Sequence, residues 1–332
     1  MRAFLLSCLL LAGLPAQAAY NAMFVFGDSL SDGGNAYALS SAAGAPFAPW
    51  PPSPPYAERF TDGPTAAEHL AAQLGIALAP STSGGSNFAV GGAMTGLGNF
   101  NYLTGSPFPL PPSLELTGAQ AQVLQFMGSP AASFDPASSL FMLWAAPNDF
   151  FFTLATGGNL LAAAETAVTN LVSSIGLLAS IGATDFLIPN MPNLASTPLG
   201  LGQTDEARQG LDLISTGFNN ALASTLAHIR AGSIPGLPGG LRLMEFDTAA
   251  FLDEVIGDPG TYGFTNVSDG CIFSAVSNCD EYLFFDGVHP TSAAHRLLGE
   301  RFHATVPEPA VPALLAIGLL SLLGVRRYTR HA

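Results

Sequence analysis

A chain of 332 residues that is 48% hydrophobic and only 10% charged can bury a sizeable core, which excludes a disordered protein. Its formal net charge is −14 at pH 7, and an acidic surface repels phosphate backbones, so we expect no nucleic-acid partner. The sequence contains no lysine, which excludes Schiff-base chemistry, Ser-Lys dyads and a P-loop.

The first 19 residues have the pattern of an export signal. Arg2 supplies a positive end, residues 3–14 are almost entirely apolar, and Ala16-Gln17-Ala18 is a small-x-small cleavage site. The apolar part is too short to span a bilayer stably. We therefore expect residues 1–19 to be a signal peptide and the protein to be exported to the periplasm, the cell surface or the medium. An N-terminal helix of the fold is the alternative.

Apolar, β-prone runs alternate with alanine-rich helical stretches along the body of the chain. Strands are expected at residues 22–26, 139–145, 185–189 and 241–246. Helices are expected at residues 65–74, 160–181, 206–230 and 292–302. This alternation predicts an α/β fold, a three-layer α/β/α sandwich around a mainly parallel sheet. Because no linker interrupts it, we expect one domain over residues 20–305.

A polar turn follows the first predicted strand. The run Gly27-Asp28-Ser29-Leu30 places Ser29 at the strand's C-terminal end, where open α/β sheets bind ligands. A helix beginning there would direct its N-terminal amides at the same spot and favour an anion. Ser29 is therefore a candidate nucleophile, although an Asp-Ser pair after a strand is often only a helix N-cap.

Near the other end of the chain, the run Asp286-Gly287-Val288-His289-Pro290 offers partners for such a serine. A serine hydroxyl needs an adjacent base at neutral pH, and an imidazole base needs an orienting acceptor. Asp286 and His289 lie three residues apart on a tight turn and can supply both. The remaining histidines of the body lie in helical patterns without an acid in a comparable turn, so His289 is the candidate base.

Four short blocks occur in sequence order along the chain. They are Gly27-Asp28-Ser29-Leu30, Ser86-Asn87-Phe88-Ala89-Val90-Gly91-Gly92-Ala93, Ala146-Pro147-Asn148-Asp149 and Asp286-Gly287-Val288-His289-Pro290-Thr291. Together they resemble the blocks of the GDSL/SGNH esterase and lipase family, over residues from about 22 to 303. The resemblance implies a flavodoxin-like sheet, hydrolysis of carboxylic esters and no cofactor. It also implies that Ser29 is the nucleophile, His289 the base and Asp286 its partner.

The resemblance further implies an oxyanion hole. Its donors would be the backbone N–H of Ser29, the backbone N–H of Gly91 and the side-chain amide of Asn148, with Gly92 as the alternative to Gly91. The third block departs from the family, because Ala146 stands where a glycine is usual. If that position has a positive φ, alanine costs about 1 kcal/mol there or shifts the backbone around Asn148.

Cysteine usage fits an oxidising compartment. Cys8 lies in the expected signal peptide, which leaves Cys271 and Cys279, eight residues apart. We expect these two to form a disulfide rather than a reactive thiol, since no basic residue lies near either in sequence. Histidine and carboxylate clusters at ligand spacing are absent from the sequence, so no metal site is expected.

The C-terminal residues 306–332 form a three-part tail. Val306-Pro307-Glu308-Pro309 precedes a largely apolar stretch, and an arginine-rich end follows. The tail resembles a PEP-CTERM sorting signal, which implies transient membrane contact and cleavage by an exosortase. A plain membrane anchor is the alternative.

The sequence therefore predicts an exported serine ester hydrolase acting on a small-molecule, lipid or sugar ester. Three variants of the same chemistry stay open: a deacetylase-type sugar esterase, a phospholipase and a thioesterase. A non-catalytic surface or matrix protein that uses the fold for binding is a further alternative. The apolar segments 100–112 and 150–152 are candidates for the lining of an acyl pocket.

Overall fold

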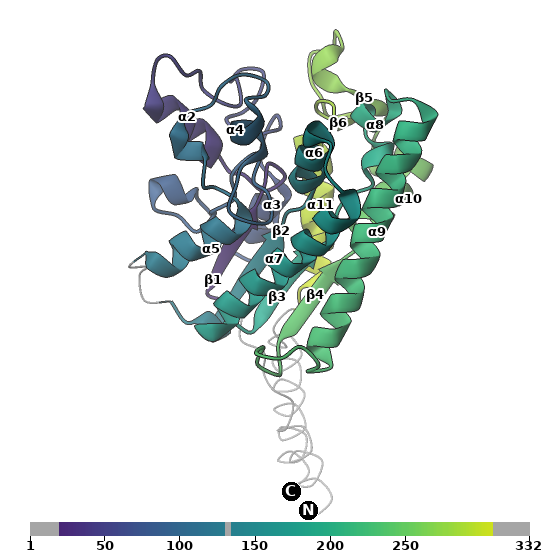
Figure 1. Cartoon of the computed structure of the whole chain (residues 1–332). Helices are drawn as coiled ribbons and strands as arrows, with labels where there is room; N and C mark the ends of the chain where they lie inside the picture. The colour runs from purple at the N-terminus through teal and green to yellow at the C-terminus, as the bar shows by residue number, and fades with distance from the viewer. Residues whose placement is uncertain (1–19, 130–133, 308–332) are drawn as a thin grey trace, which may run out of the picture. The chain divides into compact units, whose positions relative to one another are not determined.

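The computed structural model describes residues 20–129 and 134–307 (Figure 1). The expected signal peptide and all but the first two residues of the predicted sorting tail lie outside the described residues. Residues Asn21–Val306 form one compact unit.

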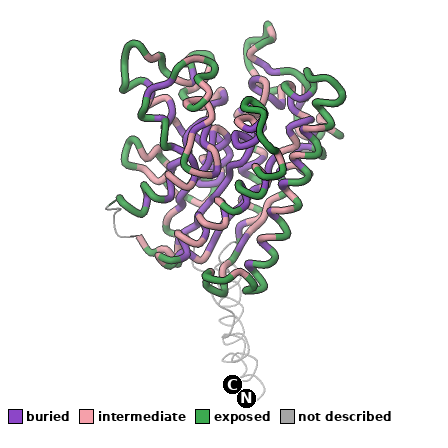
Figure 2. The backbone as a smooth tube through the Cα atoms, viewed as in Figure 1, coloured by how far each residue is buried: buried purple, intermediate pink, exposed green. Residues whose placement is uncertain are grey.

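Four parallel strands form the central sheet, in the spatial order β1-β2-β3-β4. They are β1 (Ala22–Gly27), β2 (Ser139–Trp144), β3 (Asp185–Pro189) and β4 (Arg242–Phe246), each within one residue of its predicted bounds. Every residue of β2 and β3 is buried, because helices cover both faces of a parallel sheet. Figure 2 shows the strands as a buried layer between helices.

A further extended segment lies on the outer side of β1. Val25 donates its N–H to the carbonyl of Ser86 at 3.1 Å, and its own carbonyl accepts the N–H of Phe88 at 2.8 Å. The chain thus adds residues on one side of β1 before it crosses to β2 on the other side. This reversal of direction makes the C-terminal end of β1 the switch point of the sheet, where open α/β folds bind their ligands.

Helices α5 (Ala119–Gly128), α7 (Leu160–Ser180) and α9 (Asp205–Arg230) cover one face of the sheet (Figure 1). Side chains such as Phe141 and Phe186 pack there into one large apolar cluster. Helix α7 is the one described helix long and apolar enough to cross a membrane, but its buried side chains belong to this cluster.

Helices α3 (Ala66–Gln73) and α11 (Ser292–Thr305) pack against each other on the opposite face. Phe302 of α11 contacts Trp144 of β2 and Phe246 of β4 in edge-to-face geometry, with ring centroids 5.4 and 4.9 Å apart. The four predicted helices therefore correspond to α3, α7, α9 and α11. The chain has the expected three-layer α/β/α sandwich.

Further helices and strands lie outside the central sheet and its main covering helices. They are α2 (Asn35–Ala43), α4 (Phe100–Thr104), α6 (Pro147–Thr156), α8 (Pro198–Leu201), α10 (Thr248–Gly257), β5 (Asn266–Gly270) and β6 (Tyr282–Phe284).

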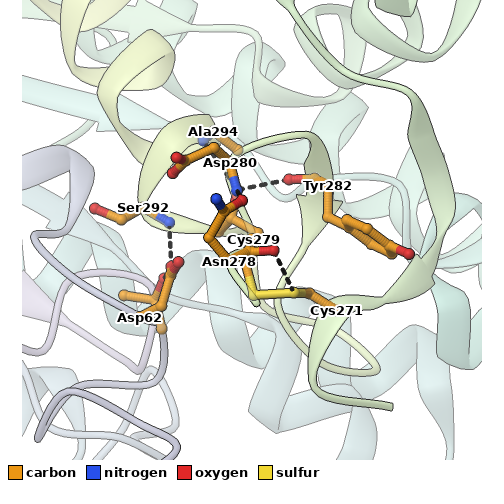
Figure 3. Close-up of a disulfide and its surroundings, with 10 residues drawn as sticks. Asp62, Cys271, Asn278, Cys279, Asp280, Tyr282, Ser292 and Ala294 are labelled. Atoms are coloured by element: carbon orange, nitrogen blue, oxygen red, sulfur yellow. Dashed lines mark hydrogen bonds between the residues drawn. A yellow bond between two sulfur atoms is a disulfide. The ribbon is translucent and has the colours of Figure 1, made fainter. Parts of the chain in front are cut away.

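A disulfide joins Cys271 to Cys279, as expected, with their Cα atoms 5.7 Å apart (Figure 3). The disulfide lies in the loop between β5 and β6. Strand β6 in turn leads into the segment that carries His289. In the same region the N–H of Ser292, at the start of α11, donates to Asp62 Oδ1 at 2.7 Å. The loop that precedes α3 is thereby tied to the start of α11.

Gly27 is the last residue of β1, and a substitution there tests how closely the sheet is packed just before Ser29. A Cβ at this position would lie 2.3 Å from the carbonyl oxygen of Trp144, which is backbone and cannot yield. We expect Gly27→Ala to lower the free energy of unfolding by about 2–4 kcal/mol, measured by urea denaturation. Gly217→Ala, on an exposed turn of α9 with open space around it, should instead stabilise the protein by about 0.5–1 kcal/mol. Equal effects of the two substitutions would contradict the packing argument.

Candidate active site

Ser29, His289 and Asp286 form a continuous hydrogen-bonded chain. His289 Nε2 lies 2.8 Å from Ser29 Oγ, and His289 Nδ1 lies 2.7 Å from Asp286 Oδ2. Ser29 follows β1, whereas the other two residues lie between β6 and α11, and His289 is 260 positions further along the chain. A backbone bond from Phe285 N–H to the His289 carbonyl, at 2.7 Å, closes the turn that presents the imidazole. The structure thus brings together the three residues that the sequence singled out.

The Asp286 carboxylate accepts four hydrogen bonds. Oδ1 accepts the N–H groups of Val288 and His289, each at 2.8 Å, and Oδ2 accepts from Tyr56 Oη and His289 Nδ1, each at 2.7 Å. Burial by itself raises the pKa of this carboxyl, but the charge and hydrogen bond of His289 and the two amides outweigh it and lower the pKa to about 2. Asp286 therefore stays ionised at neutral pH.

Tyr56 is a site residue that sequence reasoning missed. It follows the proline-rich stretch 46–55, and no spacing or motif connects it with a carboxylate 230 positions away. Burial and the neighbouring Asp286 charge raise the pKa of the Tyr56 phenol, so it is protonated and acts as the donor.

No helix begins at Ser29. Helix α2 begins at Asn35, so the helix start considered at Ser29 lies six residues further along the chain. The first amides of α2 donate to Asp32, with Asn35 N–H at 2.7 Å from Oδ1 and Ala36 N–H at 3.1 Å from Oδ2. An acidic side chain close to the helix start satisfies these donors, and Ser29 is left free of a capping role.

Gly91 and Gly92, the two alternative oxyanion donors, have different surroundings in the structure. The N–H of Gly91 donates to Asp32 Oδ2 at 2.8 Å, so the prediction that Gly91 supplies an oxyanion donor is wrong. Gly92 lines the cavity beside Ser29 with a φ of 80°, and its N–H has no acceptor within residues 20–129 and 134–307. A glycine is needed at position 91 because a Cβ there would lie 2.0 Å from the Phe60 ring.

Asn148 lies in the first turn of α6 and lines the same cavity. Its Nδ2 donates to the Ala93 carbonyl at 3.1 Å, which orients the amide and leaves a second N–H for a ligand. Ala146 just before the helix has a φ of 168°, extended backbone that any residue adopts. The strain expected from the missing family glycine is therefore absent.

Three further carboxyls are buried around the site: Asp28, Asp32 and Asp149. Burial raises the pKa of Asp28 to about 7 and the pKa values of Asp32 and Asp149 to about 6. Hydrogen bonds from Leu30, Gly34 and Thr95 oppose the shifts without cancelling them. The surroundings of Ser29 thus contain acids that are partly neutral near pH 6 to 7.

A cavity of about 410 Å³ opens over Ser29, His289, Gly92 and Asn148. Its apolar lining consists of Leu30, Trp50, Phe60, Phe100, Phe151, Leu154, Leu194, Leu199 and Val288, among others. Phe100 and Phe151 come from the two segments predicted to line an acyl pocket. Phe150 of the second segment does not line the cavity, because it is fully buried and packs on Phe218 of α9. Among the described residues, no group of three or more His, Cys, Asp or Glu side chains could hold a metal ion.

Asp28 predicts a pH dependence of stability. A folded-state pKa of about 7, above the unfolded value of 3.8, means that the folded protein binds the extra proton and loses stability as pH rises between these values. Asp28→Asn removes this ionisation, so relative to wild type the variant should gain stability from pH 4 to 8. The gain should be about 1.4 kcal/mol for each unit of pKa shift.

Thermal or urea unfolding across this pH range measures the effect. Asp205→Asn, on the exposed start of α9, is the matched control and should track wild type. A stability difference between Asp28→Asn and wild type that does not change with pH would show that Asp28 ionises as in the unfolded chain.

Comparison with known proteins agrees with the geometry. The model of the GDSL-like lipase/acylhydrolase family matches residues 23–302. A GDSL esterase/lipase of Arabidopsis thaliana is 27% identical, over 89% of this chain and 88% of its own length. The phosphatidylcholine-sterol acyltransferase of Aeromonas hydrophila is 25% identical, over 88% of this chain and 94% of its own length. The thermolabile hemolysin of Vibrio parahaemolyticus is 24% identical over 85% of this chain, which spans 62% of that protein. The chain belongs to the GDSL-like lipase/acylhydrolase family.

Proposed function

We propose that this protein hydrolyses carboxylic esters through an acyl-enzyme formed on Ser29. The observation that carries the proposal is the pair of contacts at His289, 2.8 Å from Ser29 Oγ and 2.7 Å from Asp286 Oδ2. An imidazole held between a hydroxyl and an ionised carboxylate is the arrangement that activates a serine.

The reaction begins when Ser29 Oγ attacks the ester carbonyl carbon and His289 Nε2 takes the hydroxyl proton. The carbonyl oxygen becomes an oxyanion, which accepts hydrogen bonds from the N–H groups of Ser29 and Gly92 and from Asn148 Nδ2. The intermediate collapses when the C–O bond breaks and His289 returns the proton to the departing alcohol. Water then repeats the sequence on the acyl-enzyme, which releases the acid and restores Ser29. Asp286 stays ionised and balances the imidazolium charge.

Lipid esters are the proposed substrate class. The cavity wall is dominated by aromatic and leucine side chains, which suits an acyl chain better than a charged group. The Aeromonas relative is named for a phospholipid and a sterol, which supports the same class. Sugar esters, phospholipids and thioesters would use the same three residues, and chain-length profiling on an ester panel separates them. A purely binding role is disfavoured because the Ser29–His289–Asp286 hydrogen-bond chain is complete.

We also propose that the protein works outside the cytoplasm. The Cys271–Cys279 disulfide supports an oxidising compartment, and the apolar run at residues 3–14 supports export. A sorting role for the tail, with transient membrane contact and exosortase cleavage, is part of the same proposal. Fractionation of the native host with an antibody to the body of the protein tests it.

Ser29→Ala should abolish hydrolysis of p-nitrophenyl esters, with a fall in kcat of at least about 10³-fold. Wild type should also form a covalent adduct with a fluorophosphonate at Ser29, identified by peptide mass spectrometry. His289→Ala should lose the same activity, since the hydroxyl then has no base. Equal rates for wild type and Ser29→Ala would end the proposal, and an unlabelled Ser29 would favour a binding protein.

Asn148→Ala should lower kcat by about 10²–10³-fold and leave KM nearly unchanged, because an oxyanion donor acts mainly in the transition state. Asn220→Ala, an exposed asparagine of α9 outside the cavity, is the control and should keep wild-type kinetics. A change in KM alone would place Asn148 in ground-state binding instead.

A further inference from the structure

Tyr56 and the carboxylate of Asp286 share an interaction that the proposed reaction does not require. Tyr56 Oη donates to Asp286 Oδ2 at 2.7 Å, and the same oxygen accepts His289 Nδ1 at 2.7 Å. The backbone N–H groups of Val288 and His289 both donate to Oδ1. Oδ2 therefore has two donors, His289 Nδ1 and the Tyr56 hydroxyl.

The position of Tyr56 is fixed from both sides. Its ring packs edge to face on Phe285, with centroids 5.0 Å apart, immediately before the acid in the chain. Further along its own segment, Arg59 pairs with Glu68 of α3, with Nη2 and Oε1 2.6 Å apart. Asp62 then accepts the N–H of Ser292 at the start of α11. The phenol is therefore held in place by contacts that do not involve the nucleophile.

We propose that Tyr56 is a positioning residue of the Asp286–His289 pair, and this inference rests on the proposed function. Its hydrogen bond orients Oδ2 toward the imidazole and moderates the negative charge that the carboxylate presents to it. Without that donor, Asp286 would attract the protonated imidazole more strongly and would be freer to rotate. The pH dependence of the reaction would then change with the donor, because the Asp286–His289 pair ionises as a unit.

Other titratable groups near His289 must be separated from this effect. Asp28 lies beside the nucleophile and interacts electrostatically with His289, and its pKa is raised to about 7 by burial. His295 of α11 also interacts with it, but burial lowers the pKa of His295 to about 3, so it stays neutral over the working range. The test is therefore run in both the wild-type and the Asp28→Asn background.

Tyr56→Phe keeps the ring packing and removes only the donor. We expect kcat to fall about tenfold with little change in KM, a factor that corresponds to about 1.4 kcal/mol, near the lower end for a hydrogen bond to a charged group. The acid limb of kcat/KM should move to higher pH by about 0.3–1 unit, in both backgrounds. Tyr102→Phe is the matched control, since Tyr102 of α4 is also a partly buried tyrosine of this aromatic region, and its phenol makes no hydrogen bond to Ser29, His289 or Asp286.

A merely structural role predicts a lower melting temperature and an unmoved acid limb, and this outcome overturns the proposal. The far-downfield proton NMR signal of His289 Nδ1–H gives a readout that does not depend on hydrolysis, and it should shift in Tyr56→Phe and not in Tyr102→Phe. If wild type neither cleaves esters nor forms the Ser29 adduct, the proposed function fails. If wild type is active and Tyr56→Phe shifts neither the limb nor the signal, only the role of Tyr56 fails.

Discussion

The contact between Ser29 Oγ and His289 Nε2 spans 260 positions of sequence, and the fold must hold its two ends at 2.8 Å. One end is fixed because β1 pairs with β2 along its whole length and ends at Gly27, packed against the Trp144 carbonyl. The other end is a turn whose geometry depends on backbone bonds within it and on the seating of α11 against α3 and the sheet. The C-terminal end of a paired strand thus supplies the hydroxyl, and a loop braced by a helix supplies the imidazole.

The pKa values of the four buried carboxyls of the site show when burial outweighs hydrogen bonding and when a charged partner outweighs burial. Asp32 accepts four backbone amides and its pKa is still raised, because burial costs more than those neutral donors return. Asp286 is also buried and accepts two amides, and its pKa is lowered. The difference is the imidazole of His289, the partner able to carry a full positive charge. The low pKa of Asp286 is therefore a property of the pair rather than of the aspartate.

Which features could be predicted from the sequence depends on how far apart in the chain the interacting residues lie. Strand and helix periods are local, so the four strands of the central sheet, the long helices and the three-layer architecture could be predicted, whereas the short strands β5 and β6 could not. Ser29 and the Asp286–His289 turn could be found because each occupies a short motif, and the family resemblance linked them. The choice between Gly91 and Gly92 could not be made, because adjacent N–H groups point in different directions and only the bond to Asp32 settles which one is occupied. Tyr56 had no local signature at all, since its partner is distant and its segment reads only as a proline-rich loop.

The proline-rich loop contributes both to the cavity wall and to the surroundings of His289. Trp50 and Phe60 of this region line the cavity, and their rings contact each other with centroids 5.6 Å apart. Phe60 also contacts the His289 ring at 5.3 Å and fills the space that only a glycine at position 91 leaves open. A change that reshapes this wall for a different acyl group therefore also moves the neighbours of the imidazole and of Tyr56. Within this chain, the aromatic wall of the cavity and the hydrogen bonds to the Asp286 carboxylate therefore cannot vary independently.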